Sequence, residues 1–223
     1  MANVGFTRDE VILTLDTLYT AGDDKLTKNS SKVAELCATL QLLPIHPTTK
    51  RPPNFRNTVG VSDQIRAFKQ EIAGVERPRW GIGKEFHEVA SEFEGRHSEL
   101  HQIAEAIRRN MDYFSFCNFG QGEENVGFPE GALLSHLHMV IERRDSIRFS
   151  RDERCAICQI SIDRIYNGCG NFLEHHLLTS LVKLDANKRY GQNDFITVCP
   201  NCHAALHRYR PWKTRDNLTD ILR

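Results

Sequence analysis

"VCPNCHAALHRYRPW", residues 198–212, is the stretch of sequence that decides how the end of this chain folds. Cys199 and Cys202 form a Cys-x-x-Cys pair, and His203 and His207 follow with a spacing of four residues. Side chains four residues apart lie on the same side of a helix, so both histidines can share one metal ion. The stretch therefore predicts a metal-binding turn that leads directly into a helix bearing further metal ligands.

A second Cys-x-x-Cys pair, Cys155 with Cys158, lies earlier in the same part of the chain. Four thiolates satisfy Zn²⁺ in a tetrahedron, and each Cys-x-x-Cys turn supplies two of them. We therefore predict a structural zinc ion held by Cys155, Cys158, Cys199 and Cys202. A redox-active dithiol pair is the alternative, but the thioredoxin-like βαβ pattern that such a pair requires is not seen.

The adjacent histidines His175 and His176 occur in "LEHHLL" between the two cysteine pairs. A zinc ion with four thiolates has no open position, so a catalytic metal would need other ligands. Neighbouring side chains diverge on a strand, so one histidine can bind such a metal while the other faces a substrate. This division suits phosphodiester hydrolysis, in which a divalent ion neutralises phosphate charge and a neutral imidazole takes a proton from water. The alternative is a plain zinc ribbon whose histidines pack or cap.

The hydrophobic pattern indicates an α+β protein that is mostly helical before residue 150. Thr7 and Glu10 form the capping box of a first helix, which ends at Ala21 and Gly22. Further helices are predicted over 30–43, about 62–72, 84–110 and 129–144. The apolar runs "GNFLEHHLL" and "DFITVC" predict short strands, and "NCHAALHRYR" predicts a helix after them.

Composition excludes several classes of protein. The 223 residues are 40% hydrophobic and 26% charged, which is typical of a folded globular chain, and the formal net charge is zero. No apolar run approaches the roughly 18 residues of a membrane span, and "MANVGFTRDE" lacks the pattern of a signal peptide. We therefore expect a cytoplasmic protein with no membrane partner.

The segments "CAIC", "YNGCGNFLEHH" and "NDFITVCPNCHAALH" together resemble an HNH endonuclease of the zinc-bearing ββα-metal class. The resemblance spans about residues 151–215 and is greatest to the McrA-like predicted restriction endonucleases. It implies a C-terminal ββα-metal HNH module behind a mostly α-helical N-terminal region. It also implies that His176 is a general base, supported by Asp194 or its neighbour Asn193. The ligands that it implies for a catalytic divalent metal are His175, His203 and His207. Two features depart from the family pattern: Glu174 directly precedes the histidine pair, and the proline that often follows the pair is replaced.

The resemblance implies metal-dependent hydrolysis of DNA, most simply double-stranded DNA, with Mg²⁺, Mn²⁺, Ni²⁺ or Zn²⁺ at the catalytic site. It favours restriction of foreign DNA, and DNA that carries modified cytosine is one candidate substrate. RNA or structured DNA is an alternative substrate for the same site. The alternative from another class is a catalytically silent zinc module that binds DNA or protein. One active site per chain and two DNA strands would suggest a homodimer, although sequential nicking would not.

The upstream sequence resembles the same family more loosely. "PPNFRNTVGVSDQIRAF" resembles an Arg-Asn motif of its leading domain, and "FPEGALLSHLHMVIERR" resembles the helix that precedes the HNH module. We expect a helical N-terminal domain over 1–75, which could recognise the target, a helical middle region over 76–150 and a nuclease domain over 151–223. Phosphate contact needs accessible cations, and the candidates are Lys50, Arg51, Arg56 and Arg66, followed near the last helix by Arg208 and Arg210 with Trp212. The alternatives are solvated surface charge and, near the last helix, a cap over the helix end.

Overall fold

The computed structural model describes residues 4–22, 25–75, 82–116, 131–143, 154–166, 172–209 and 212–222. The chain divides into two compact units, Met1–Leu133 and Leu134–Arg223. Helices dominate the described residues, and the strands among them form one two-stranded sheet, so the predicted α+β class is confirmed. The division differs from the three predicted domains, because the helices of the predicted middle region are shared between the two units.

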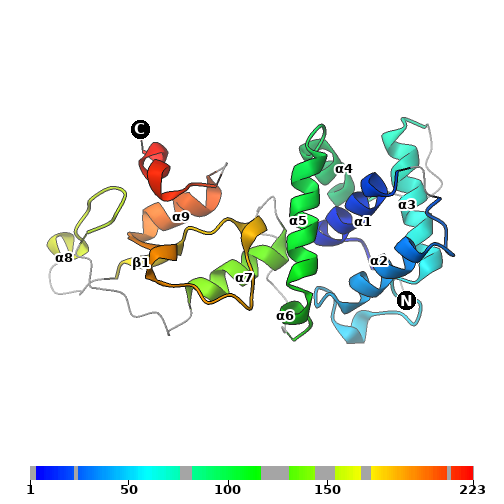
Figure 1. Cartoon of the computed structure of the whole chain (residues 1–223), viewed down its shortest axis with the longest axis horizontal. Helices are drawn as coiled ribbons and strands as arrows, with labels where there is room; N and C mark the ends of the chain where they lie inside the picture. Colours follow the sequence, from blue (N-terminus) through cyan, green and yellow to red (C-terminus); the bar gives the residue numbers. More distant parts are fainter. Residues whose placement is uncertain are drawn as a thin grey trace. The chain divides into compact units, whose positions relative to one another are not determined.

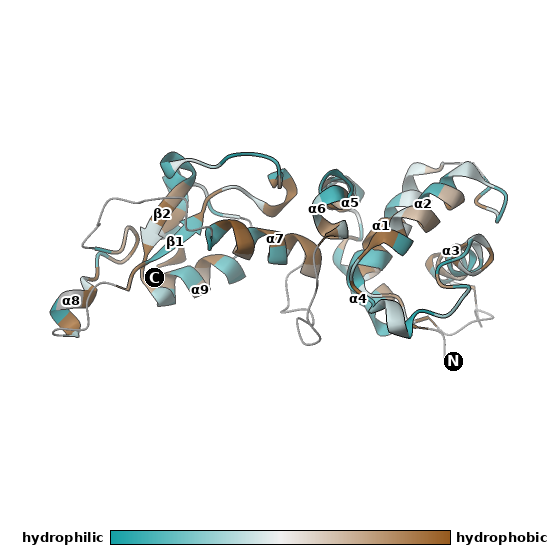
Figure 2. Ribbon diagram, turned by 90° about the horizontal axis from the view of Figure 1, so that it is seen from below, coloured by the Kyte–Doolittle hydropathy of each residue, from teal (hydrophilic) through white to brown (hydrophobic). Residues whose placement is uncertain are grey.

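The first unit is a group of helices arranged around α1. In chain order its elements are α1 (Arg8–Thr20), α2 (Ser31–Leu42), η1 (Thr48–Lys50), α3 (Thr58–Ile72), α4 (Lys84–Glu92), α5 (His97–Arg109) and α6 (Met111–Ser115). Helix α1 contacts α2, α3, α4 and α5 (Figure 1). Much of α1 is apolar (Figure 2), and every residue from Asp9 to Thr17 is buried. The core of this unit therefore lies around α1.

The first helix begins as predicted. Thr7 and Glu10 form the capping box, and the Thr7 backbone N–H donates to Glu10 Oε2 over 2.8 Å. Helix α3 begins at Thr58, earlier than predicted, because the Asn57 side chain caps it by accepting from the Gly60 backbone N–H at 2.8 Å.

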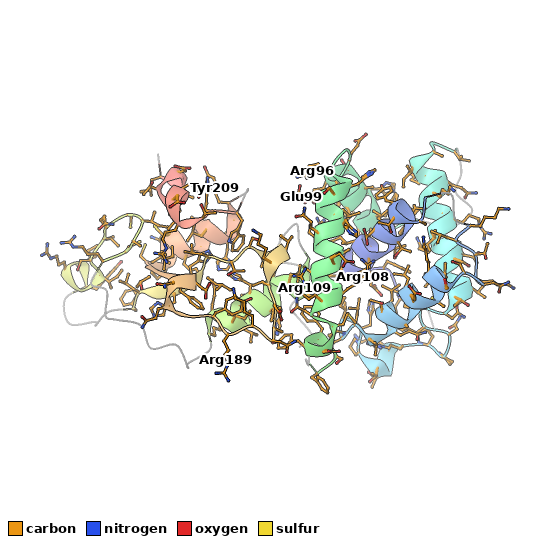
Figure 3. All side chains as sticks on the ribbon, viewed as in Figure 1. Arg96, Glu99, Arg108, Arg109, Arg189 and Tyr209 are labelled. Atoms are coloured by element: carbon orange, nitrogen blue, oxygen red, sulfur yellow. The ribbon has the colours of Figure 1, made fainter. Side chains whose placement is uncertain are left out.

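The segment 84–110 forms two helices, α4 and α5, rather than one continuous pattern. Gly95 lies between them with φ +69°, a left-handed conformation that glycine adopts without strain. Helix α5 is held to α1 by polar contacts as well as apolar ones. Arg108 of α5 lies beside α1 (Figure 3), and its Nη1 donates to Asp16 Oδ2 at 2.6 Å.

The second unit contains most of α7 (Ala132–Glu142) and the predicted strands and final helix. Its other elements are α8 (Ile162–Ile165), β1 (Glu174–Leu177), η2 (Leu181–Lys183), η3 (Gln192–Asp194), β2 (Phe195–Val198), α9 (Pro200–Arg208) and η4 (Arg215–Ile221). The strands pair antiparallel, with Glu174 opposite Val198 and Leu177 opposite Phe195. Helix α7 was predicted from Pro129, but Pro129 and Glu130 lie outside the described residues.

The core of the second unit is built around its cysteines. Apolar side chains from several of its elements pack with Cys155, Cys199 and Cys202 into one buried cluster; they are Ile157, Ile162, Ile196, Val198, Leu206 and Leu218. A unit of this size has a small core, and a metal ion bound within it would add to its stability. Among the described helices, none has both the length and the apolar character needed to cross a membrane.

Candidate metal centres

The four predicted zinc ligands lie together. The Sγ atoms of Cys155, Cys158, Cys199 and Cys202 are all within 4.8 Å of one another, and those of Cys158 and Cys199 are 3.7 Å apart. Thiolates bound tetrahedrally to one zinc ion at about 2.3 Å are about 3.8 Å apart. The predicted cluster is therefore confirmed, and it fits a structural metal such as zinc.

Backbone hydrogen bonds shape the first cysteine turn and attach it to the sheet. The Ile157 N–H donates to Cys155 Sγ at 3.4 Å, and the Ala156 N–H donates to the Thr197 carbonyl of β2 at 2.9 Å. Burial raises the pKa of the Cys155 thiol, but the surrounding backbone N–H groups outweigh burial and hold that pKa at about 7. Burial and the neighbouring thiols raise the pKa of Cys202. The protein alone therefore favours the thiolate of Cys155 and disfavours that of Cys202. A divalent cation would stabilise all four thiolates at once through its charge.

A second group of metal-ligand side chains comes from three elements of the same unit. His176 lies on β1, His203 and His207 lie on α9, and Glu142 lies on α7; one donor atom of each is within 4.8 Å of the others. His203 Nε2 and His207 Nε2 are 2.9 Å apart, and each is 3.2 Å from Glu142 Oε2. His176 Nδ1 lies 3.0 Å from Glu142 Oε1. The two helix histidines therefore share one site, as their spacing predicted.

These separations fit a common cation. Donors bound to one ion at about 2.1 Å lie about 3.0–3.4 Å apart in octahedral or tetrahedral geometry. His176 Nδ1 is buried and makes no aligned hydrogen bond with any described residue, although the Glu142 carboxylate is close. A buried imidazole nitrogen without a partner is costly unless a ligand satisfies it. Imidazole and carboxylate donors of this kind suit Zn²⁺, Mn²⁺ or Ni²⁺.

Surrounding groups orient the ligands. Glu174 Oε2 accepts from His203 Nδ1 at 2.5 Å, which turns Nε2 of that ring toward Glu142 and His207. The backbone N–H of Leu177 donates to Glu142 Oε1 at 2.9 Å, which leaves Oε2 to face the two helix histidines. Metal-binding histidines commonly donate their other ring N–H to a carboxylate in this way.

The electrostatics of the group favour the ligand forms of Glu142 and His176, but not that of His203. Burial raises the pKa of the Glu142 carboxyl, but the three histidines around it outweigh burial and hold that pKa far below its usual range. Burial lowers the pKa of His176, so its ring is neutral near pH 7, as both a metal ligand and a general base require. Burial lowers the pKa of His203, but Glu142 and Glu174 raise it more strongly.

Two aromatic side chains enclose His176. Trp212 stacks on it with ring centroids 5.5 Å apart, and its Nε1 donates to the Leu178 carbonyl at 3.2 Å. His138 of α7 is fully buried, with its ring 5.5 Å from that of His176 and its Nε2 3.2 Å from the Leu177 carbonyl. Burial lowers the pKa of His138 to about 3, so the ring is neutral. His138 and Trp212 therefore restrict the orientation of His176.

The structure does not bring His175 into this group. His175 lies on the other side of β1, where its Nδ1 is 3.3 Å from Thr197 Oγ1. The strand separates the adjacent histidines as predicted, but His176 is the one that meets the helix histidines. The carboxylate of Glu142 completes the set in place of the expected His175.

The two residues expected to support the base lie in the turn before β2. The Asp194 side chain accepts from the Gly191 N–H at 2.8 Å, and its carbonyl accepts from the Leu178 N–H at 2.8 Å. The Asn193 carbonyl accepts from Arg215 Nη2 at 3.0 Å. Neither side chain contacts His176 among the described contacts. Asp194 instead shapes the turn and, through its carbonyl, fixes the end of β1.

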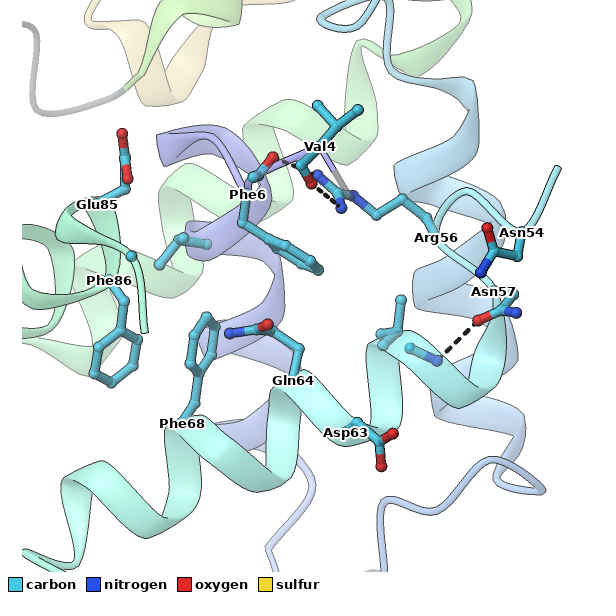
Figure 4. A pocket seen from close by; sticks show the side chains of 15 residues that line it. Val4, Phe6, Asn54, Arg56, Asn57, Asp63, Gln64, Phe68, Glu85 and Phe86 are labelled. Atoms are coloured by element: carbon cyan, nitrogen blue, oxygen red, sulfur yellow. Dashed lines mark hydrogen bonds between the residues drawn. The ribbon is translucent and has the colours of Figure 1, made fainter. Parts of the chain in front are cut away.

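The predicted DNA contact of Arg56 is corrected by the structure. Its guanidinium is buried, donates to both carboxylate oxygens of Glu10 at 2.7 and 2.9 Å, and also donates to the Val4 and Gly5 carbonyls. Figure 4 shows it directed at Val4 and Phe6. Arg51 likewise donates to two backbone carbonyls at the end of α2, so it stabilises the segment that follows this helix.

The other cationic candidates differ in exposure. Lys50 is exposed at the end of η1. Arg66 is exposed and pairs with Asp63. Arg208 is exposed at the end of α9, and Arg210 lies outside the described residues.

Glu142 is the member of the histidine group that the sequence did not predict. It follows His138 by four residues, so both project from one side of α7 toward the group. That spacing was the available signal.

A comparison of the chain with protein-family models, curated proteins and solved structures finds no match.

Proposed function

We propose that this protein is a metal-dependent nuclease of the HNH type that hydrolyses phosphodiester bonds of DNA. The observation that carries the proposal is the meeting of Glu142, His176, His203 and His207 in one group beside the four-cysteine cluster. The donors are those of a catalytic centre, and the sequence order of strand, strand and helix is that of the resembling nucleases. Restriction of foreign DNA rests on the resemblance alone.

Glu142, His203 and His207 are the proposed metal ligands. Their facing atoms are separated by 2.9–3.2 Å. Two histidines and one glutamate form an established catalytic ligand set, because three protein ligands leave a position open for water or substrate. The third ligand comes from α7, in place of His175.

His176 is the proposed general base. Its ring is neutral and buried, and it is held between Trp212 and His138. A divalent ion at the site supplies positive charge that stabilises the phosphate and its leaving oxygen. His176 takes a proton from the attacking water as the new O–P bond forms and the bond from phosphorus to O3′ breaks. The leaving O3′ takes a proton from a water molecule of the solvent, and His176 later releases its proton to solvent, which gives 5′-phosphate and 3′-hydroxyl ends.

Adjacent histidines provide a matched test. We expect His176→Ala to abolish the nicking of supercoiled plasmid by the full chain with Mg²⁺, Mn²⁺ or Ni²⁺, while the zinc content stays unchanged. His175→Ala removes the neighbouring ring on the other side of β1, and we expect it to retain cleavage. If His175 were a ligand, as the resemblance implies, both variants would be inactive.

Two outcomes would overturn the proposal. Undiminished cleavage by His176→Ala would remove the base assignment. No cleavage by the wild-type chain with any divalent ion would favour a zinc module that only binds DNA or protein. The substrate is identified by comparing cleavage rates on plasmids with methylated, hydroxymethylated and plain cytosine, and on RNA. Equal rates on the three plasmids would exclude a dependence on cytosine modification.

A further inference from the structure

The first unit contains a hollow of about 550 Å³ with a basic wall. It lies between α3, the end of α1 and the loop that joins α1 to α2. Four exposed cations line it, and the one carboxylate among its lining residues is Asp63; the cations are Lys25, Lys28, Arg66 and Lys69. The hollow is therefore suited to an anionic ligand.

The basic character is local. The whole chain has a formal net charge of zero. The hollow of about 410 Å³ shown in Figure 4 holds one cation, Arg56, and Glu10 neutralises it. A third hollow, of about 300 Å³, has more carboxylates than lysines and arginines in its lining. Of these three hollows in the described part of the first unit, the one beside α3 has the largest excess of cations: Arg66 pairs with Asp63, and three lysines remain.

The cations of α3 form a row. Ser62, Arg66 and Lys69 are four and three residues apart, so they lie on one side of the helix. Arg66 and Lys69, the two cations among them, are three residues apart, and three residues of α-helix rise about 4.5 Å, a little more than the rise of one nucleotide along a DNA strand. Together with Lys25 and Lys28, which also line the hollow, they suit a ligand that carries several negative charges rather than a single small anion.

Residues 25–28 line the hollow from the segment between α1 and α2. The Thr27 N–H donates to the Lys25 carbonyl at 2.9 Å, and the Ser30 N–H donates to the Thr27 carbonyl at 2.9 Å. Lys25 and Lys28 therefore line the hollow from a hydrogen-bonded segment, while Arg66 and Lys69 line it from α3. Lys25, Lys28 and Lys69 form no ion pair with any residue that the structure describes. Phosphates can therefore contact them without first displacing a carboxylate.

We propose that this hollow binds the sugar–phosphate backbone of duplex DNA through Lys25 and Lys28 of that segment and Arg66 and Lys69 of α3. The choice of DNA as the polyanion rests on the proposed nuclease function. Contacts of this kind position a protein on DNA without reading its sequence. They replace the contacts expected from the buried Arg56 and retain the one expected from Arg66.

The test compares two double substitutions that remove equal charge. Binding of the full chain to a short duplex is measured by fluorescence anisotropy over a series of salt concentrations, without added divalent ion. We expect Lys28→Gln with Lys69→Gln to lower the slope of log affinity against log salt concentration by about 2, similarly for unrelated sequences. The control pair, Lys50→Gln with Lys84→Gln, should leave the slope unchanged, because neither lysine lines the hollow. Lys28→Arg with Lys69→Arg should retain wild-type binding.

Equal losses for the test and control pairs would overturn the proposal, because the attraction would then be diffuse. An unchanged slope for the test pair would also overturn it, as would tighter binding of single-stranded RNA than of duplex DNA. Binding and cleavage are measured separately. A test pair that weakens binding, in a chain that cleaves nothing, supports the hollow and overturns the nuclease. Normal cleavage with an unchanged slope for the test pair supports the nuclease and overturns the DNA-binding role of the hollow.

Discussion

The substitution Glu174→Gln tests whether the histidine group is a metal centre. Glu174 Oε2 lies 2.5 Å from His203 Nδ1, and the rest of the group contacts the other nitrogen of that ring. Carboxylates that orient a ligand histidine typically contribute 10–100-fold to metal affinity. The side chain of Glu174 is 46% exposed, so water screens the contact, and we take the low end of that range. The expected loss is about tenfold in affinity, or about 1.4 kcal/mol.

The pH dependence of this loss is a second readout. Glu142 and Glu174 raise the pKa of His203, so in the wild-type protein a proton competes with the metal more strongly as the pH falls. Without the Glu174 charge that pKa is lower, and the competition at acid pH is weaker. The ratio of wild-type to variant affinity should therefore be larger at pH 8 than at pH 6.

Isothermal titration with Mn²⁺ measures both effects in protein whose cysteine cluster has first been loaded with zinc. His175→Ala is the matched control, because it alters the next residue of β1 on the other side of the strand. Wild-type affinity in Glu174→Gln at both pH values would refute the ligand assignment of His203. Loss of the zinc in the variant would show instead that Glu174 supports the fold.

Two predictions concern the first unit. Arg56→Ala leaves the buried Glu10 carboxylate with a weaker set of partners, and we expect urea unfolding to show a loss of about 3 kcal/mol; a loss below about 1 kcal/mol would contradict a buried structural pair. Burial raises the pKa of Asp9 to about 6, although the backbone N–H groups of Ala132 and Leu133, which donate to its carboxylate, lower that pKa in part. The folded state therefore keeps a proton that the unfolded chain releases near pH 4, and the stability from this group is lost as the pH rises through about 6. Melting temperatures should show this fall between pH 4.5 and 7 relative to Asp9→Asn, and parallel curves for the two proteins would exclude it.

The features that sequence predicted best are those with local spacing. A Cys-x-x-Cys turn, or two histidines four residues apart on a helix, brings its side chains together through backbone geometry alone. The cysteine cluster followed from such spacing and is confirmed, and the Nε2 atoms of His203 and His207 lie 2.9 Å apart. The break at Gly95 was also visible as a glycine within an amphipathic pattern, and giving it more weight would have separated α4 from α5.

The features that sequence missed depend on which side of an element faces its neighbour. Alternation along a strand shows that His175 and His176 diverge, but only the packing of β1 shows which of them meets α9. Glu142 looks like a surface charge in "IERR", because nothing local reveals that α7 packs its end against β1. Arg56 looks like an accessible cation in the sequence, because its partner Glu10 lies far away along the chain and nothing local reveals the pairing.

The cysteine cluster and the histidine group are coupled through the start of α9. Cys199 is the N-cap of that helix, and its carbonyl accepts from the His203 N–H at 2.9 Å, which is the first bond of the helix. The cluster therefore fixes both where α9 begins and how His203 and His207 are rotated about its axis. On the other side of the group, the bond from the Leu177 N–H to Glu142 joins α7 to β1. The side chains of the histidine group are thus placed by elements that other contacts already hold, so the proposed metal site would need little rearrangement to accept an ion.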